Sequence, residues 1–170
     1  RIDEYRGKFQ AFARLPEPIE VYFKGKRVLD AGCGEGRFSY LAGALGAEHV
    51  VGVDYSREAL HRAMIGTGNP PNCSFIRADI LNLPLRRTFD YVFSVGVLHH
   101  APETREAYQA IVRHLKVGGY ITIFVYGKWT LPFIIWPLRR WSLRRDVERI
   151  RELCDALGFG YDPGVIPRFP

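Results

Sequence analysis

Three glycines at alternate positions carry the clearest chemical signal in the chain. Gly32, Gly34 and Gly36 follow an apolar run that ends in an acid, within the segment Val-Leu-Asp-Ala-Gly-Cys-Gly-Glu-Gly of residues 28–36. Because glycine has no Cβ, it adopts positive φ angles easily and lets a ligand touch the main chain. The pattern therefore predicts a loop that holds a small ligand against its backbone.

A second acid follows at a distance typical of nucleoside-binding folds. The apolar residues 49–53 are followed by Asp54, which comes about 20 residues after the glycine loop. An acid at the end of such a strand can accept hydrogen bonds from both hydroxyls of a ribose. Together, the glycine loop and Asp54 predict a nucleoside ligand.

The glycine spacing separates two classes of nucleoside cofactor. A dinucleotide fingerprint reads G-x-G-x-x-G, and its third glycine would fall at Arg37. Asp30 and Glu35 place carboxylates close to the loop, where they would repel a pyrophosphate and attract a positively charged ligand. The pattern D-x-G-x-G-x-G resembles motif I of the class I methyltransferases that use S-adenosylmethionine. An NAD-dependent oxidoreductase is the less favoured alternative.

The resemblance extends over residues 24–126. Residues 52–56 resemble motif II, in which the acid holds the ribose and the next residue lies along the adenine, and residues 78–80 resemble motif III, whose acid accepts the adenine amino group. Residues 89–100 resemble the fourth strand and the turn that faces the methyl acceptor. The resemblance thus implies these cofactor-binding residues: Asp30, Gly32, Cys33, Gly34, Gly36, Asp54, Tyr55, Ser56, Ala78, Asp79, Ile80 and Ser94.

Two histidines follow the expected fourth strand, where the acceptor should enter. Methyl transfer from a sulfonium needs mainly alignment, and a base only when the acceptor arrives protonated. Histidine can accept a proton near neutral pH. We therefore predict His100, ahead of His99, as the catalytic base, with a purely structural role of both as the alternative.

Strand and helix patterns alternate along the chain, which predicts an α/β fold with a doubly wound, mostly parallel, Rossmann-like sheet. Ligands bind such sheets at the carboxyl ends of the strands, where Asp30, Asp54, Asp79 and Ser94 are expected. The expected strands are 27–30, 49–53, 73–79, 89–94 and 120–125, and the expected helices are 2–15, 37–45, 56–65 and 103–115.

The chain is interpreted as one domain of three parts. Residues 1–23 form an N-terminal helical segment over the cofactor site, residues 24–126 the S-adenosylmethionine-binding core, and residues 127–170 a basic and aromatic cap with a tail. The family resemblance implies two antiparallel strands after the fifth strand, and residues 127–170 instead indicate a helix at 146–157. We expect the missing strands to lie beyond this chain; a shortened fold is the alternative.

Charge distribution bears on the acceptor. The net charge is +6, and residues 128–151 contain seven bases and two acids, interspersed with aromatic side chains. This composition suits a small or medium-sized acceptor that is amphipathic or anionic, including a lipid-linked substrate at a membrane surface. The alternative is a solvated basic face. Nucleic acid is the least favoured partner, because the cluster is short and no nucleic-acid-binding motif accompanies it.

Composition excludes several other classes. No apolar stretch is long enough to span a membrane, and the opening residues lack the apolar region of a signal peptide. Cys33, Cys73 and Cys154 are scattered without metal-ligand spacing, so we expect no metal, reduced thiols and a cytoplasmic location. Two functions remain: methyl transfer from S-adenosylmethionine, or a non-catalytic methyltransferase-like module that binds the cofactor or a partner. Oligomeric state is not indicated.

Overall fold

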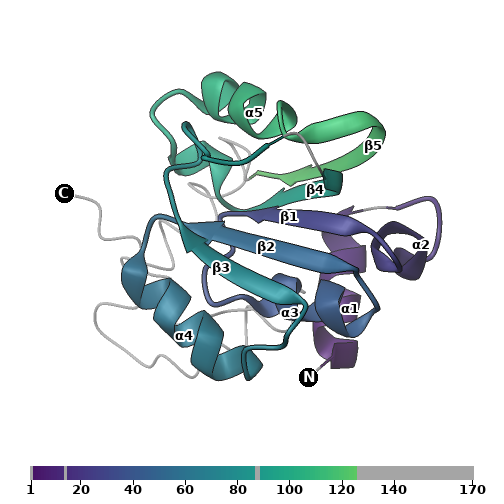
Figure 1. Cartoon of the computed structure of the whole chain (residues 1–170). Helices are drawn as coiled ribbons and strands as arrows, with labels where there is room; N and C mark the ends of the chain where they lie inside the picture. Colours follow the sequence, from purple (N-terminus) through teal and green to yellow (C-terminus); the bar gives the residue numbers. More distant parts are fainter. Residues whose placement is uncertain (1, 14, 87–88, 126–170) are drawn as a thin grey trace, which may run out of the picture. The chain divides into compact units, whose positions relative to one another are not determined.

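The computed structural model describes residues 2–13, 15–86 and 89–125. These residues contain a parallel sheet with the strand order β3-β2-β1-β4-β5, flanked by helices (Figure 1). The expected parallel α/β sheet is confirmed. The strands are β1 (Arg27–Ala31), β2 (His49–Asp54), β3 (Cys73–Arg77), β4 (Phe89–Val95) and β5 (Leu115–Phe124), and the helices are α1 (Ile2–Ala13), α2 (Ile19–Phe23), α3 (Arg37–Ala44), α4 (Arg57–Thr67), the short 3₁₀ helix η1 (Leu98–His100) and α5 (Thr104–Val112).

Strand β1 occupies the centre of the sheet. Asp30 of β1 lies opposite Gly52 of β2 on one side and Phe93 of β4 on the other, and both neighbours run parallel to β1. The chain first builds outward through β2 and β3 and then returns to place β4 on the other side of β1. The carboxyl ends of β1 and β4 therefore form the switch point at which α/β sheets bind ligands.

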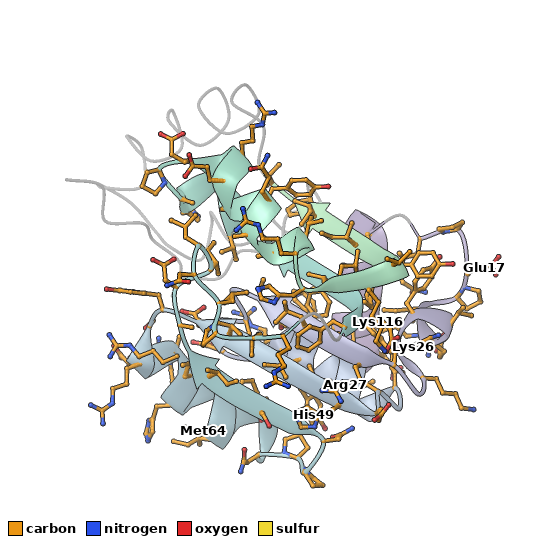
Figure 2. All side chains as sticks on the ribbon, turned by 45° about the horizontal axis from the view of Figure 1, so that its top comes forward. Glu17, Lys26, Arg27, His49, Met64 and Lys116 are labelled. Carbon is orange, nitrogen blue, oxygen red and sulfur yellow. The ribbon has the colours of Figure 1, made fainter. Side chains whose placement is uncertain are left out.

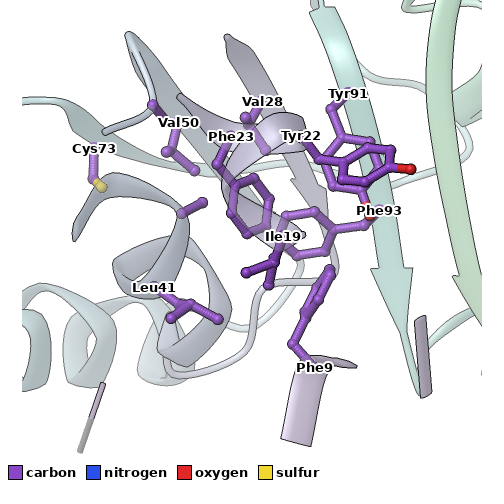
Figure 3. Packing of buried hydrophobic residues seen from close by; sticks show 12 residues of the cluster. Phe9, Ile19, Tyr22, Phe23, Val28, Leu41, Val50, Cys73, Tyr91 and Phe93 are labelled. Carbon is purple, nitrogen blue, oxygen red and sulfur yellow. The ribbon is translucent and has the colours of Figure 1, made fainter. Parts of the chain in front are cut away.

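Helices pack on both faces of the sheet. Neighbouring residues of each strand point to opposite faces, so β1 contributes to a core cluster on each face. On one face, Val28 and Phe93 pack with Phe9 of α1 and Phe23 of α2. The ring of Phe9 lies 5.6 Å from that of Phe23 and 5.1 Å from that of Phe93, centroid to centroid. Figure 3 shows these side chains in the cluster. On the opposite face, Leu29 packs with residues of α5 in a second cluster.

Several element boundaries differ from those expected. Strand β5 begins at Leu115, not at 120, because Leu115 pairs with Phe89 before the ladder resumes at Tyr120 opposite Tyr91. The residues between them bulge out of the ladder, with Gly118 at φ 78°. The strand pairing of Leu115 depends on Phe89, which is distant in the sequence, so no local pattern indicates it.

The helices differ in a similar way. Helix α5 ends at Val112, three residues before the expected end, which leaves Leu115 free to pair with β4. Helix α4 runs to Thr67, beyond the expected end, and stops at Gly68 in the left-handed conformation. Helix α2 and η1 were not predicted; each is a single short turn, too brief to show an apolar period.

The expected C-terminal elements fall outside the described residues. The chain divides into two units, residues 1–125 and 126–170. The expected helix 146–157 and the basic cap therefore remain predictions. In the part of the chain that the structure describes, no helix is long and apolar enough to cross a membrane.

Candidate cofactor site

The loop after β1 is tied to the carboxyl end of β2. The backbone N–H groups of Gly32 and Cys33 both donate to the carbonyl oxygen of Val53, at 2.8 and 2.9 Å. The three loop glycines have positive φ angles, 87° at Gly32, 52° at Gly34 and 72° at Gly36. This backbone conformation explains the alternate glycines, because residues with a Cβ rarely adopt it.

The three glycines differ in their surroundings. A Cβ on Gly32 would clash with both methyl groups of Val97, and a Cβ on Gly36 would lie 2.9 Å from the ring of Phe75. A Cβ on Gly34 would meet no heavy atom within 4 Å. The protein itself therefore fills the space beside two of the glycines, whereas Gly34 leaves main chain accessible to a ligand.

Asp54, at the end of β2, accepts two backbone hydrogen bonds. Its Oδ2 accepts from the N–H of Gly34 at 2.9 Å, and its Oδ1 accepts from the N–H of Ser56 at 2.8 Å. Each carboxylate oxygen has a second acceptor position, so the same side chain retains capacity for ribose hydroxyls. The carboxylate and the open Gly34 backbone together fit a nucleoside cofactor.

Residues of the expected adenine side lie at the ends of β2 and β3. Tyr55 is 70% exposed, and the Arg77 guanidinium lies 5.6 Å from the centre of its ring. Asp79 is exposed, and its Oδ1 accepts the N–H of Leu81 at 2.9 Å. An exposed aromatic ring can stack on a base, and an exposed carboxylate can accept its amino group. Their assignment to adenine stays a prediction.

Other predicted site residues have evident structural contacts. Ser56 caps α4, because its Oγ accepts the N–H of Ala59 at 3.2 Å. Ser94 is buried and donates its hydroxyl to the carbonyl oxygen of Ala31 at 2.7 Å, which joins β4 to β1 at the switch point. Ala78 and Ile80 pack against the core cluster that contains Leu29. Their contacts with a cofactor remain predicted.

Asp30 is buried and bonded within the protein. It is 2% exposed, and the fully buried hydroxyl of Ser39, on α3, donates to its Oδ2 at 2.6 Å. Burial raises the pKa of Asp30 to about 7; the hydrogen bond from Ser39 lowers this pKa, and the nearby charge of Asp54 raises it. The neighbouring Cys33 is also buried, and burial raises the pKa of its thiol, which lowers the reactivity of this side chain.

Glu35, the other acid of the loop, lies on the surface. Its carboxylate pairs with the guanidinium of Arg62, with 3.0 Å between Oε1 and Nε. The pair joins the loop to α4. Attraction of a positively charged ligand by Glu35 therefore remains a prediction, with part of its charge already balanced by Arg62.

The histidine turn lies beside the glycine loop, because Val97 packs on Gly32. His99 and His100 end η1, with their ring centres 4.0 Å apart. His99 is partly buried, and burial, followed by the charge of His100, lowers its pKa. His100 is exposed. The arrangement places one solvent-accessible imidazole close to the carboxyl edge of the sheet.

Sequence reasoning assigned no role in the site to Ser39, Phe75 or Val97. Each contacts a predicted site residue only in the folded structure. Val97 lies in the turn that resembles the acceptor-facing segment, whereas Ser39 and Phe75 belong to no such motif. Two lysines, Lys26 and Lys116, lie at the amino ends of the strands, distant from this site. Figure 2 shows them near Arg27. Both lysines line a cavity of about 100 Å³.

Within the described ranges, no cluster of three or more metal-ligating side chains occurs.

A parallel sheet with a glycine loop after its first strand and an acid at the end of its second defines the class of α/β nucleoside-cofactor domains. Residues 23–136 match the family described as the methyltransferase domain. The chain belongs to this family. The predicted fold class and family are confirmed, and so is S-adenosylmethionine as the methyl donor.

Individual proteins show the same relationship. The chain is 32% identical over 161 residues to a protein of Encephalitozoon cuniculi named as a methyltransferase, covering 81% of this chain and 72% of the relative. It is 35% identical over 106 residues to the tRNA U34 carboxymethyltransferase of Shewanella halifaxensis, covering 59% of this chain and 31% of that enzyme.

Among solved structures, an S-adenosylmethionine-dependent methyltransferase from Mesorhizobium loti superimposes with a TM-score of 0.60 at 29% identity, covering 72% of this chain and 54% of that protein. This chain therefore spans about half the length of the Mesorhizobium protein and about a third of the Shewanella enzyme.

Proposed function

We propose that this protein transfers the methyl group of S-adenosylmethionine to a small or medium-sized acceptor. The observation that carries the proposal is the hydrogen bond between the Gly34 backbone and Asp54, which combines an open main-chain surface with a carboxylate at the carboxyl end of β2. Family membership supports the same chemistry.

Each part of the site has a proposed role toward the cofactor. The Gly34 backbone lies along the methionine part, Asp54 accepts the ribose hydroxyls, Tyr55 stacks on the adenine and Asp79 accepts its amino group. Three facts support these roles: the space beside Gly34, the acceptor capacity of Asp54 and the exposure of Tyr55. S-adenosylmethionine supplies a methyl group already activated on a sulfonium, so the remaining task of the protein is to orient the acceptor.

His100 is the proposed proton acceptor when the acceptor arrives protonated. Its ring is exposed, so an acceptor hydroxyl could reach it, and its turn contacts the cofactor loop through Val97 and Gly32. His99 is partly buried against His100 and is proposed to orient that ring. Histidine near neutral pH suits proton transfer.

The proposed acceptor is amphipathic or anionic, and a lipid-linked molecule fits this chemistry. Support comes from the sequence, where residues 128–151 combine seven bases with aromatic side chains. These residues lie outside the described part of the chain. The Shewanella relative is named for a tRNA, so a tRNA belongs in the acceptor panel as the competing class.

Calorimetry and product analysis test the proposal. We expect dissociation constants in the range of about 1–100 μM for S-adenosylmethionine and S-adenosylhomocysteine, which correspond to roughly 5–8 kcal/mol, and no measurable binding of NAD. Incubation with acceptor panels should release S-adenosylhomocysteine. Binding without release would favour the non-catalytic module, and tight NAD binding with no methyl-donor binding would contradict both.

A further inference from the structure

Asp30 and Ser39 form a buried polar pair that spans the cofactor loop. Asp30 comes two residues before Gly32, and Ser39 comes three residues after Gly36. The Ser39 Oγ donates to Asp30 Oδ2 at 2.6 Å, and the two residues are 0% and 2% exposed. Their hydrogen bond therefore joins the end of β1 to the first turn of α3, and so holds the two ends of the glycine loop together.

The sheet leaves room for this pair at Gly52. Gly52 lies opposite Asp30 in the β1–β2 register, and a Cβ there would lie 3.0 Å from Ser39 Oγ and 2.8 Å from the Phe75 ring. The same ring would meet a Cβ on Gly36 at 2.9 Å. Two glycines and one aromatic ring thus let α3 approach β2 closely enough for Ser39 to reach Asp30.

The pair is also anchored from β3. The Cys73 thiol donates to the backbone carbonyl of Ser39 at 3.6 Å. The backbone N–H of Ser39 also donates to Asp30. Because buried polar groups are costly when they lose a partner, removal of the Ser39 hydroxyl destabilises the Asp30 carboxyl, which keeps only the backbone donor of this residue. The Asp30 side chain would then rearrange or bind a proton. Either change would alter the glycine loop that lies between Asp30 and Ser39.

We propose that Ser39 is a positioning residue for the cofactor, which sets the geometry and charge of the glycine loop through Asp30. This inference rests on the proposed function, because it takes the glycine loop as the cofactor site. Ser39 itself is fully buried, so the proposed role is exerted through Asp30 and not by ligand contact.

The charge of Asp30 provides a specific readout. Burial raises the pKa of Asp30 to about 7, and the hydrogen bond from Ser39 opposes this rise. The titratable groups around it are Asp54, at the end of β2, and the thiols of Cys33 and Cys73, whose pKa values burial raises, that of Cys73 to about 11. A ligand ammonium binds better to the ionised carboxylate. Loss of the Ser39 hydroxyl should raise the pKa of Asp30, and the pH midpoint of ligand binding should therefore shift to higher pH.

The test measures S-adenosylhomocysteine binding by calorimetry between pH 6 and 8 for wild type, Ser39→Ala and the matched control Ser74→Ala. Ser74 also makes a partly buried hydrogen bond, with His49 Nε2 at 3.1 Å, on β3. We expect Ser39→Ala to bind about tenfold more weakly at pH 7, with its pH midpoint shifted upward, and Ser74→Ala to match wild type.

A double-mutant cycle identifies the route through Asp30. In an Asp30→Asn background, Ser39→Ala should weaken binding by less than about threefold, because coupled residues are not additive. Ser39→Cys keeps the unbranched shape of the side chain, with a larger atom and a weaker donor, so it gives the same readout should Ser39→Ala fail to fold. Equal affinity and pH midpoint in wild type and Ser39→Ala, or additive effects in the cycle, would overturn the inference. Absence of binding by wild type would instead contradict the proposed function.

Discussion

The backbone N–H of Gly34 donates to Asp54 Oδ2 over 2.9 Å, which joins the only loop glycine with open space beside it to the acid at the end of β2. A residue of the β1 loop and a residue 20 positions later thus form one structural unit. Asp54 therefore shapes the loop even before any ligand binds.

Replacement of Asp54 by Ala should weaken S-adenosylmethionine binding by about 10- to 100-fold. Hydrogen bonds to a charged group contribute about 1.5–3 kcal/mol each, and the variant loses both the predicted ribose contacts and the bond to Gly34. Asp90→Ala is the matched control, because Asp90 also accepts a backbone N–H, that of Arg27 at 2.9 Å, at the other end of the strands. Unchanged affinity in Asp54→Ala would disprove the assignment.

Alanine at two of the loop glycines should produce different losses. Gly32→Ala combines a positive φ with a clash against Val97 and should cost about 2–4 kcal/mol of unfolding free energy. Gly34→Ala has space for its methyl group and should cost only about 1–2 kcal/mol, yet reduce cofactor affinity at least about tenfold by occupying that space. Urea denaturation and calorimetry separate the two quantities. The prediction fails if Gly34→Ala binds as wild type does.

If the acceptor is a hydroxyl, His100→Ala should lower kcat by about 10²- to 10⁴-fold, because general-base catalysis contributes that much. Cofactor affinity should stay close to that of wild type. His99→Ala should have a smaller effect, since its partly buried ring is proposed only to orient His100. Equal and small effects of the two substitutions at saturating acceptor would show that alignment alone carries the reaction.

The buried carboxyl of Asp30 should make stability decrease as pH rises. Its native pKa of about 7 lies above the ordinary value of about 3.9, so the native state holds this proton more tightly than the unfolded state. The stabilisation is fully present below about pH 4 and is lost as pH rises to about 7, for a total of about 4 kcal/mol. The difference in unfolding free energy between Asp30→Asn and wild type should therefore change in favour of the variant over this interval. A constant difference would contradict the raised pKa.

Charge reversal at Arg139 and Arg140 tests the proposed acceptor chemistry. Arg139→Glu with Arg140→Glu should raise the KM of an anionic acceptor, and added salt should reduce the effect, because exposed charges are screened over about 8 Å at physiological ionic strength. Cofactor affinity should not change. Kinetics of an anionic acceptor that remain unaltered at low salt would mean that the basic cluster is only a solvated surface.

Local sequence patterns were sufficient to predict elements that have a clear apolar periodicity or that begin or end at a residue with a strong preference for that position. The apolar runs that end in Asp30 and Asp54 became β1 and β2, and the expected helix 56–65 became α4, which Ser56 caps. Boundaries failed where pairing with a distant strand decided them: Leu115 joins β5 only because Phe89 lies beside it. A residue whose state depends on a partner far along the chain carries no local signal of that state.

The sequence by itself determined the class of fold, the glycine loop and the acids at the strand ends. These features depend on the conformational freedom of glycine and on the pattern of apolar residues within each segment. Only the tertiary structure decided which glycine leaves space for a ligand, and that the Ser39 hydroxyl donates a hydrogen bond to the Asp30 carboxylate. Both depend on the order of the strands: Val97 and Phe75 reach Gly32 and Gly36 across the sheet, and Gly52 leaves the space in which the Ser39 hydroxyl meets its carboxylate.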